Sequence, residues 1–580
     1  MRSRGASIPA CLSLGLSVLT LLSACKKPEA AATANTAASV VTPANAGPRR
    51  VTIATSQEPD TLLSMFAEVG AAQQVIEAGV RWLTYFDREW KLQPGLAVEI
   101  PTLQNGGVVL LDGSGAVVKD VASARKMRVT WKLHPEARWA DGTPVTAHDF
   151  IFAHEVLADP TQEVRDRTVV EKVEKLEAQD EKTLVVHWKE PYAFYLAYRN
   201  HPALPRHALE KAYRVDGGRT LSLKKSEFGR APLLYGPFMF QEWKPGEYIR
   251  LVRNPHAHLK PVVDEVIWRF VPKDSSAVAM LETGAVDAIS PDGTVTPDAA
   301  LELLQRRPND FVVDFQPGMV WAHVDVNVEN AWLQDKRVRQ ALLHALDRQG
   351  AINAVFKGRY LVSHGLFPDR HPGHHAALKQ FAFDAARADV LLTEAGWKKG
   401  PDGIRVNGKG ERLVLELVYA TGQKSTDDLL QIFQSNLKNV GVELKLLGSP
   451  PKVFFGETLK HRKSQHLAFY AWVTDPFGYA ETILPSHQIP SEKNSWQGTN
   501  YMGYRNTEAD KLVAEIPREL DAEARAAKQR RLNDLFVDEL PILPIYTRPV
   551  VSIARKGFQN WAPTGTQTTV SWNAERWSLQ

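Results

Sequence analysis

The feature that most constrains the fold of this chain is the alternation of strand-like and helix-like segments through its second half. Runs of β-branched and apolar residues with the length of strands lie at 413–420, 442–448, 466–472 and 542–547. Segments with apolar residues near a 3.6-residue period lie at 335–356, 385–395, 426–440 and 509–539. Strands that alternate with helices are typical of βαβ units, so we predict a mixed α/β fold.

The first half of the chain predicts the same class of fold. A β-branched strand begins near Arg50, a helix is predicted over 75–86, and residues 107–132 have the pattern of a hairpin followed by a further strand. Thr146 precedes an apolar periodic segment and Asp149 stands three residues later. This spacing predicts a capping box at the start of a helix.

The composition excludes several classes of protein. The only long apolar run, 8–24, is N-terminal, which excludes a polytopic membrane protein. The 70 basic and 66 acidic residues are mixed, without a block of five like charges, so nothing favours nucleic-acid binding. The two cysteines, Cys11 and Cys25, lie in the first 25 residues, which excludes a disulfide framework or a cysteine-rich metal site in the body.

The N-terminal segment has the pattern of an export signal. Arg2 and Arg4 form a positive start, and the apolar run after them is too short for a comfortable bilayer span. The tetrapeptide LSAC at 22–25 resembles the lipobox of bacterial lipoproteins. This resemblance implies that a signal peptide, 1–24, is removed and that the sulfur of Cys25 receives a diacylglycerol. An ordinary signal peptide with a cysteine at that place by chance is the alternative.

The segment 25–48 is predicted to be a lipid-anchored flexible tether. Alanine, threonine, proline and asparagine dominate 26–48, which has no aromatic residue. Such a segment buries too little apolar surface to offset its ordering entropy. A folded body on this tether works next to a membrane, so we expect the protein in the periplasm or cell envelope. Which membrane holds the anchor stays open.

Four segments of the body carry a family resemblance when they are taken together. They are 131–160, which contains WADGTPVTAHDF, and 235–255, 263–289 and 334–352. In this order they resemble the dipeptide/oligopeptide-binding family of ABC-transporter solute-binding proteins, extracellular solute-binding protein family 5. A weaker fifth match is 385–397. The motif residues Trp139, Arg339 and Asp347 are expected to hold the scaffold rather than the ligand.

The resemblance implies an α/β, two-lobe, venus-flytrap fold of the large peptide-binding type, with an extra subdomain inserted in lobe I. Lobe I is expected to combine 50–75, 205–315 and 545–580, the inserted subdomain to cover 76–204, and lobe II to span 316–544. The implied function is the substrate-binding component of an ABC importer, which captures di- to oligopeptides between its lobes. It would deliver them to an ABC permease in the inner membrane. We expect a monomer without cofactor or enzymatic activity.

The resemblance also places the anchor for the amino end of a peptide. Family members that bind peptides have a carboxylate three residues after a tryptophan that ends a strand. The strand 466–472 ends in Trp472, and Asp475 follows at this spacing. Asp475 is therefore predicted to pair with the ammonium group; a turn-forming aspartate before a proline is the alternative. The backbone of Ala471 and Val473 is predicted to pair with the peptide as an added strand.

The remaining candidate ligand contacts come from both lobes. Glu68, Val69 and Gly70 match the loop by which lobe I approaches the ligand in peptide-binding relatives. Lys424 falls near the place where dipeptide binders carry an arginine for the carboxylate; a solvated loop lysine is the alternative. Residues that are candidate apolar pocket walls, with core packing as the alternative, are Tyr419, Trp472 and Tyr501.

Other functions remain to be weighed against peptide transport. The same family includes binders of opines, glutathione, haem, nickel chelates and oligosaccharides, and a ligand sensor without transport is also open. His364, His371, His374 and His375 lie within 12 residues, but a Pro-Gly turn interrupts them and no carboxylate spacing supports a site, so we expect no metal. The body lacks GxSxG, HExxH and any cysteine nucleophile, which argues against a hydrolase.

Overall fold

The computed structural model describes residues 49–67, 69–164, 167–196, 202–215, 219–220, 222–291, 295–474, 476–566 and 569–580. They belong to one compact unit, Pro48–Gln580. The predicted signal peptide, the tether with Cys25, and the candidate residues Glu68 and Asp475 lie outside the described residues. Within these ranges no helix is long and apolar enough to cross a membrane.

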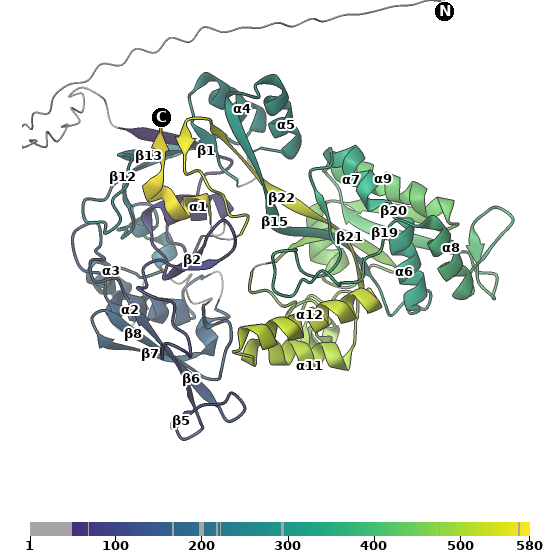
Figure 1. The fold of residues 1–580 in the computed structure, drawn as a ribbon, viewed down its shortest axis with the longest axis horizontal. Coiled ribbons are helices and arrows are strands. Elements are labelled where there is room, and N and C mark those ends of the chain that lie inside the picture. The colour runs from purple at the N-terminus through teal and green to yellow at the C-terminus, as the bar shows by residue number, and fades with distance from the viewer. Residues whose placement is uncertain are drawn as a thin grey trace, which may run out of the picture. The chain divides into compact units, whose positions relative to one another are not determined.

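An 11-stranded sheet runs through the unit in the order β11-β12-β13-β1-β14-β22-β15-β21-β19-β20, with β16 beside β22 (Figure 1). Its strands are β1 (Arg50–Thr55), β11 (Phe238–Lys244), β12 (Tyr248–Arg253), β13 (Glu265–Phe270), β14 (Ala288–Ile289), β15 (Phe311–Val326), β16 (Leu361–Val362), β19 (Val414–Ala420), β20 (Glu443–Ser449), β21 (Leu467–Val473) and β22 (Ile542–Arg555). The mixed α/β fold is confirmed. The strands predicted near Arg50 and at 413–420, 442–448, 466–472 and 542–547 are also confirmed, as β1, β19, β20, β21 and the start of β22, whereas β15 was not predicted.

The two longest strands, β15 and β22, connect the two parts of this sheet. Residues 311–316 of β15 pair with 550–555 of β22, and 320–325 pair with 542–548. Between these stretches 317–319 lie opposite Pro549 alone, and the register shifts. Pro317 and Pro549 have no N–H to donate, so the ladder is interrupted here. We call this break the strand crossing, the strands on the β11 side the lobe I sheet, and those on the β20 side the lobe II sheet.

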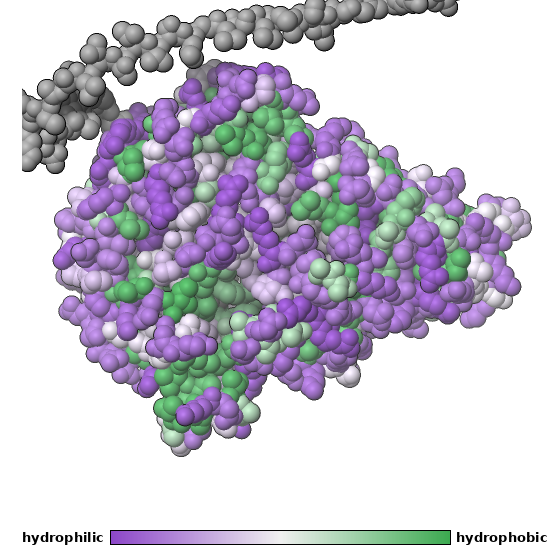
Figure 2. All heavy atoms as spheres, in the orientation of Figure 1, coloured by the Kyte–Doolittle hydropathy of each residue, from purple (hydrophilic) through white to green (hydrophobic). Residues whose placement is uncertain are grey.

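A separate five-stranded sheet, β5-β4-β6-β8-β7, lies within the residues predicted to form the inserted subdomain. Its strands are β4 (Val108–Leu111), β5 (Val117–Val118), β6 (Lys126–Lys132), β7 (Val173–Asp180) and β8 (Thr183–Trp188), and α2 (Ala147–Ala158) packs beside them. The predicted capping box is confirmed, since the Thr146 N–H donates to Asp149 at 2.8 Å. Figure 2 shows apolar residues gathered at the β5 end, where Val117 is exposed.

The remaining elements are helices and short strand pairs. The helices are α1 (Gly70–Gly79), α3 (Arg206–Tyr213), α4 (Asp274–Thr283), α5 (Pro297–Arg306), α6 (Lys336–Ala345), α7 (Arg348–Phe356), α8 (Ala385–Glu394), α9 (Lys424–Asn439), α10 (Pro451–Val453), α11 (Thr507–Glu515) and α12 (Ala522–Glu539). The short pairs are β2 (Thr84–Phe86) with β3 (Leu92–Pro94), β9 (Arg214–Val215) with β10 (Arg219–Thr220), β17 (Lys398–Lys399) with β18 (Arg405–Val406), and β23 (Phe558–Gln559) with β24 (Ser578–Leu579).

Three predicted helices have different bounds in the structure. The helix predicted over 75–86 is α1, which ends at Gly79 because glycine and the β-favouring residues after it disfavour helix. The helix predicted over 335–356 is two, because the Asp347 side chain accepts from the Gly350 N–H and starts α7. The helix predicted over 509–539 is also two, since Pro517 lies in a 3₁₀ turn between α11 and α12.

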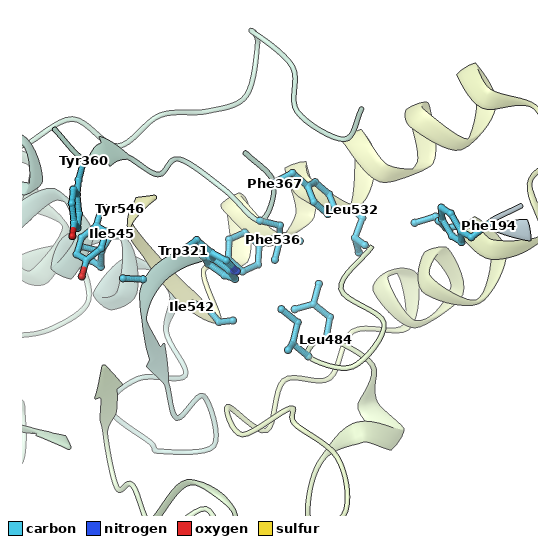
Figure 3. Close-up of a cluster of buried hydrophobic side chains, with 14 of the residues drawn as sticks. Phe194, Trp321, Tyr360, Phe367, Leu484, Leu532, Phe536, Ile542, Ile545 and Tyr546 are labelled. Carbon is cyan, nitrogen blue, oxygen red and sulfur yellow. The ribbon is translucent and has the colours of Figure 1, made fainter. Parts of the chain in front are cut away.

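The scaffold roles of the motif residues are confirmed. Arg339 is buried and donates to the carbonyls of Leu333 and Glu539. The indole of buried Trp139 donates to Asp149 at 3.3 Å. On one face of the lobe II sheet, Trp321 packs against Phe536 of α12, and Figure 3 shows both within a larger apolar cluster.

Gly565 lies against the strand crossing, and its substitution tests how tightly this region is packed. Its φ is +76°, and a Cβ there would lie 2.2 Å from the carbonyl oxygen of Pro317. We expect Gly565→Ala to lower the free energy of unfolding by about 2 kcal/mol or more, because both backbone strain and a steric clash are introduced. Gly113→Ala is the control, since no atom lies within 4 Å of its added Cβ. Equal denaturation midpoints for the two variants would contradict close packing at the crossing.

Candidate functional site

The carboxyl ends of the parallel strands in both sheets point to the strand crossing. In the lobe I sheet, β1 is parallel to β13 and β14, and β14 runs antiparallel to β22 with Ile289 opposite Ile553. In the lobe II sheet, β19, β20 and β21 are parallel, and Val473 lies opposite Val320 of β15. Open α/β sheets bind ligands outside the carboxyl ends of their strands. The candidate site is therefore the region beside the crossing that both sets of strand ends approach.

The last residues of β21 have an edge without a strand neighbour. The β19 ladder reaches β21 only as far as Tyr419 opposite Phe469. On the other side, β21 stays paired with β15, and the Thr474 N–H donates to the Met319 carbonyl at 2.9 Å. Among the described residues, no strand pairs with the β19 side of β21 after Phe469, and Val473 is 65% exposed there. An unpaired strand edge of this kind is where an extended chain adds through main-chain hydrogen bonds.

The structure separates two of the predicted pocket walls. Residues directly opposite each other in a ladder share one face of the sheet. Tyr419 lies opposite Phe469, so it shares a face with Ala471 and Val473. Trp472 lies on the other face. Tyr419 and Trp472 therefore do not line one pocket.

Trp472 and Tyr501 come together around Tyr470. Their ring centroids lie 5.7 Å and 6.4 Å from that of Tyr470, which is buried. Phe455, 49% exposed, stands 6.4 Å from Tyr470 on the outer side of the cluster. Both predicted wall residues thus belong to one aromatic cluster.

A buried carboxylate lies beneath this aromatic cluster. The Tyr470 hydroxyl donates to Asp325 at 2.5 Å, and burial together with that carboxylate holds the pKa of the phenol well above its usual range. His323 Nε2 lies 3.4 Å from the other oxygen of Asp325. The sequence did not predict Tyr470, His323 and Asp325 as site residues, although their alternation along 321–325 and 468–472 marks one face of each strand.

Lys424 is the first residue of α9 and points to solvent. Its side chain is 86% exposed and forms an ion pair with Asp428 on its own helix at 2.5 Å. Nearby, burial and a hydrogen bond with Asp427 raise the pKa of the Tyr419 hydroxyl. The predicted contact of Lys424 with a ligand carboxylate would have to break the pair with Asp428, and it stays a prediction.

On the lobe I side, Val69 and Gly70 form the start of α1. Val69 is the N-cap residue, in an extended conformation, and its own side chain does not cap the helix. A Cβ on exposed Gly70 would have no atom within 4 Å, so the helix start is open on that side. The Ala72 N–H donates to the Val69 carbonyl at 3.0 Å, and the other N–H groups of a first helical turn are suited to acceptor groups. Contact of these two residues with a ligand stays a prediction.

The C-terminal segment holds α1 in place through a buried carboxyl. Glu77 accepts from the Trp82 indole at 2.9 Å and from the Thr569 N–H at 2.7 Å. Burial raises the pKa of Glu77 to about 7, despite lowering contributions from these hydrogen bonds and from Arg81. Two residues after the end of α1, Arg81 forms an ion pair with Glu575 at 2.5 Å.

The four clustered histidines have separate surroundings. His371 is buried and stacks on Phe367 with ring centroids 4.2 Å apart. His375 pairs with Asp534 of α12 at 2.9 Å. Burial lowers the pKa of both His364 and His371 to about 4. In the described part of the chain, no three His, Cys, Asp or Glu residues are arranged to hold a metal ion.

Comparison with known proteins now decides the family. A model described as "Bacterial extracellular solute-binding proteins, family 5 Middle" matches residues 91–494, more than half of the chain. The chain belongs to this family. The family resemblance predicted from the motifs is thereby confirmed. Its members are extracellular or periplasmic substrate-binding transport proteins, and it is not an enzyme family.

Relatives and solved structures agree with this family. Oligopeptide-binding protein AppA of Bacillus subtilis (strain 168) is 24% identical over 500 residues, 84% of each chain. The oligopeptide-binding protein from Thermus thermophilus, complexed with pentapeptide, has a TM-score of 0.65 and 28% identity over 91% of this chain and 96% of its own. NikZ from Campylobacter jejuni, in complex with Ni(L-His), has a TM-score of 0.69 and 22% identity over 91% and 99%, a likeness of fold alone. The two-lobe α/β fold is confirmed.

The raised pKa of Glu77 predicts how the stability of this solute-binding protein changes with pH. A carboxyl whose folded-state pKa lies above its unfolded value of 4.5 contributes stability below pH 4.5, and that stability is lost as pH rises through about 7. We expect the free energy of unfolding to fall by about 3 kcal/mol over this range through Glu77 alone. Glu77→Gln should remove that component in urea titrations at pH 4.5, 6 and 8. The same pH slope in both proteins would contradict it.

Proposed function

We propose that this solute-binding protein captures di- to oligopeptides with a free amino end between its two lobes and delivers them to an ABC permease. The observation that carries the proposal is the unpaired edge of β21 at the strand crossing. An extended peptide adds to such an edge through main-chain hydrogen bonds, so affinity does not depend on side-chain sequence. Relatives named for oligopeptide binding support this class of ligand.

The two ends of the peptide need different partners. Asp475 follows the β21 edge directly and is proposed to pair with the ammonium group, because a buried cation requires a counter-charge. Ala471 and Val473 supply backbone groups, and Trp472 and Tyr501 supply an apolar wall on one face. Tyr419, on the opposite face of the sheet, is proposed to contact side chains of the peptide. Lys424, released from Asp428, would meet the carboxylate of a short peptide.

Lobe I is proposed to complete the site with Glu68, Val69 and Gly70. A ligand that contacts both lobes stabilises the closed form by its differential affinity for that form. The closed protein then docks as a monomer on the permease, which supplies the ATP-driven step. The protein itself carries out no chemical reaction.

The division of the chain and its attachment complete the proposal. Lobe I would comprise 50–75, 205–315 and 545–580, the inserted subdomain 76–204, and lobe II 316–544. A signal peptide, 1–24, would be removed, and a lipid on Cys25 would anchor the protein to the cell envelope through the tether 25–48.

A ligand titration tests the proposed function. Residues 48–580, purified without denaturation, are titrated by calorimetry with di- to pentapeptides, and with glutathione, an opine, haem, an oligosaccharide and Ni(L-His) as rivals. We expect peptides with a free amino end to bind and the rivals not to bind. Binding of a rival alone would retain the fold and replace the ligand class.

Asp475→Ala tests the amino-end anchor in the same titration. We expect free-amino peptides to lose roughly 2–5 kcal/mol of binding free energy, because a buried ammonium group loses its partner. N-acetylated peptides should lose much less. Asp402→Ala, which removes an exposed partner of Arg412 away from the proposed contacts, is the control and should change binding by about 1 kcal/mol or less. Equal losses for free and acetylated peptides would contradict the anchor.

Cys25→Ser tests the lipid anchor. Lipidation needs the thiol, so we expect radiolabelled palmitate to enter the wild-type protein in cells and not the variant. The variant should also leave the membrane fraction. Cys11→Ser, in the predicted signal peptide, is the control and should retain the label. Label in the Cys25→Ser protein would refute the lipobox.

A further inference from the structure

Four aromatic rings join the inserted subdomain to lobe II. Phe194 stacks on Tyr479 with centroids 5.0 Å apart and an interplanar angle of 11°. Phe477 lies 5.3 Å from Phe86 of β2 and 6.0 Å from Phe194. We call Phe86, Phe194, Phe477 and Tyr479 the aromatic clasp. Figure 3 shows Phe194 beside the helices of the C-terminal half of the chain.

The turn between α11 and α12 strengthens this junction. The Ala193 N–H, next to Phe194, donates to the Pro517 carbonyl at 2.6 Å. Arg525 of α12 lies over the Phe194 ring at 5.7 Å, and its guanidinium is held by the Glu519 carbonyl. The rings therefore have fixed partners on both sides of the junction.

The clasp is closely connected to the candidate site. Phe477 follows Val473, the last residue of the β21 edge, by four residues, which span at most about 14 Å. The end of the β21 edge and the clasp residue Phe477 are therefore within that distance of each other.

The clasp and the strand crossing are different kinds of connection. At the crossing, β15 and β22 join the lobes covalently and through a hydrogen-bonded ladder. At the clasp, the subdomain meets lobe II through side chains and backbone groups that can separate. Figure 1 shows the subdomain and α12 below β15 and β22. Lobes that turn about the crossing must part at the clasp.

We propose that the aromatic clasp is the gate of the binding site. It holds the inserted subdomain against lobe II in the closed form, and a ligand enters or leaves when Phe194 separates from Tyr479 and Phe477. This inference rests on the proposed function for its ligand, but the opening of the clasp itself requires none. The inserted subdomain is thereby assigned a role in closure.

Distance measurements on the ligand-free protein test the gate. Residues 48–580 contain no cysteine, so dyes attached through Ser114→Cys and Lys511→Cys report the separation of the subdomain from lobe II by single-molecule energy transfer. We expect Phe194→Ala and Tyr479→Ala each to raise the ratio of open to closed molecules about tenfold. The double variant should add little, because either change removes the same stack. Phe383→Ala, an exposed ring of lobe II, is the control and should change nothing.

A second readout uses a bound peptide. In stopped-flow displacement we expect Phe194→Ala to release a fluorescent peptide about tenfold faster than wild type, with little change for Phe383→Ala. Phe194→Leu retains apolar bulk without the stack and should give a smaller change in the same direction, which covers the case in which the alanine variant fails to fold. Wild-type dye distances in folded Phe194→Ala or Phe194→Leu would overturn the gate. Absence of any peptide binding would overturn the proposed function, while the dye distances still test the clasp.

Discussion

The pairing of β15 with β22 is the interaction on which the rest of this structure depends. Among the described strands of the 11-stranded sheet, β15 and β22 form the ladder that extends through both lobes. Twelve residue pairs join the two strands, six on each side of one break. The break occurs at Pro317 and Pro549 because neither proline has a backbone N–H to donate to the ladder. Each sheet half is completed by strands from its own side, so the crossing sets how the two halves face each other.

The position of the candidate site follows from this pairing. Since β14 runs antiparallel to β22 and β21 antiparallel to β15, the carboxyl ends of both sets of parallel strands approach the crossing. The loops after these ends carry the candidate ligand contacts of both lobes. A site built in this way depends on the relative position of the lobes. The aromatic clasp, formed by segments far apart in sequence, is a second connection between the lobes. Because its side-chain contacts can separate, the relative position of the lobes can change.

Much of the local structure could be predicted from the sequence. The strand 466–472 and the Thr146–Asp149 capping box depend on residues close together in the chain, and both were found at their predicted places. The helix breaks at Asp347 and Pro517 were missed, although each is also a local effect. Both predictions followed the apolar periodicity, which continues across Asp347 and Pro517, and so gave one helix in place of two. For the site, the pairing of Ala471 and Val473 with a peptide stays a prediction, and the division of Tyr419 and Trp472 between two faces depends on register with a neighbouring strand.

The sequence by itself determined the family, the class of fold, and the strand and helix content, because motifs and periodicity are properties of neighbouring residues. Tertiary structure alone decided two further points. It buried Asp325 under Tyr470 and brought Phe194 onto Tyr479. Both residues contact partners more than a hundred positions away in the chain. Such contacts are set by how sheets and helices pack, for which no short stretch of sequence carries the information.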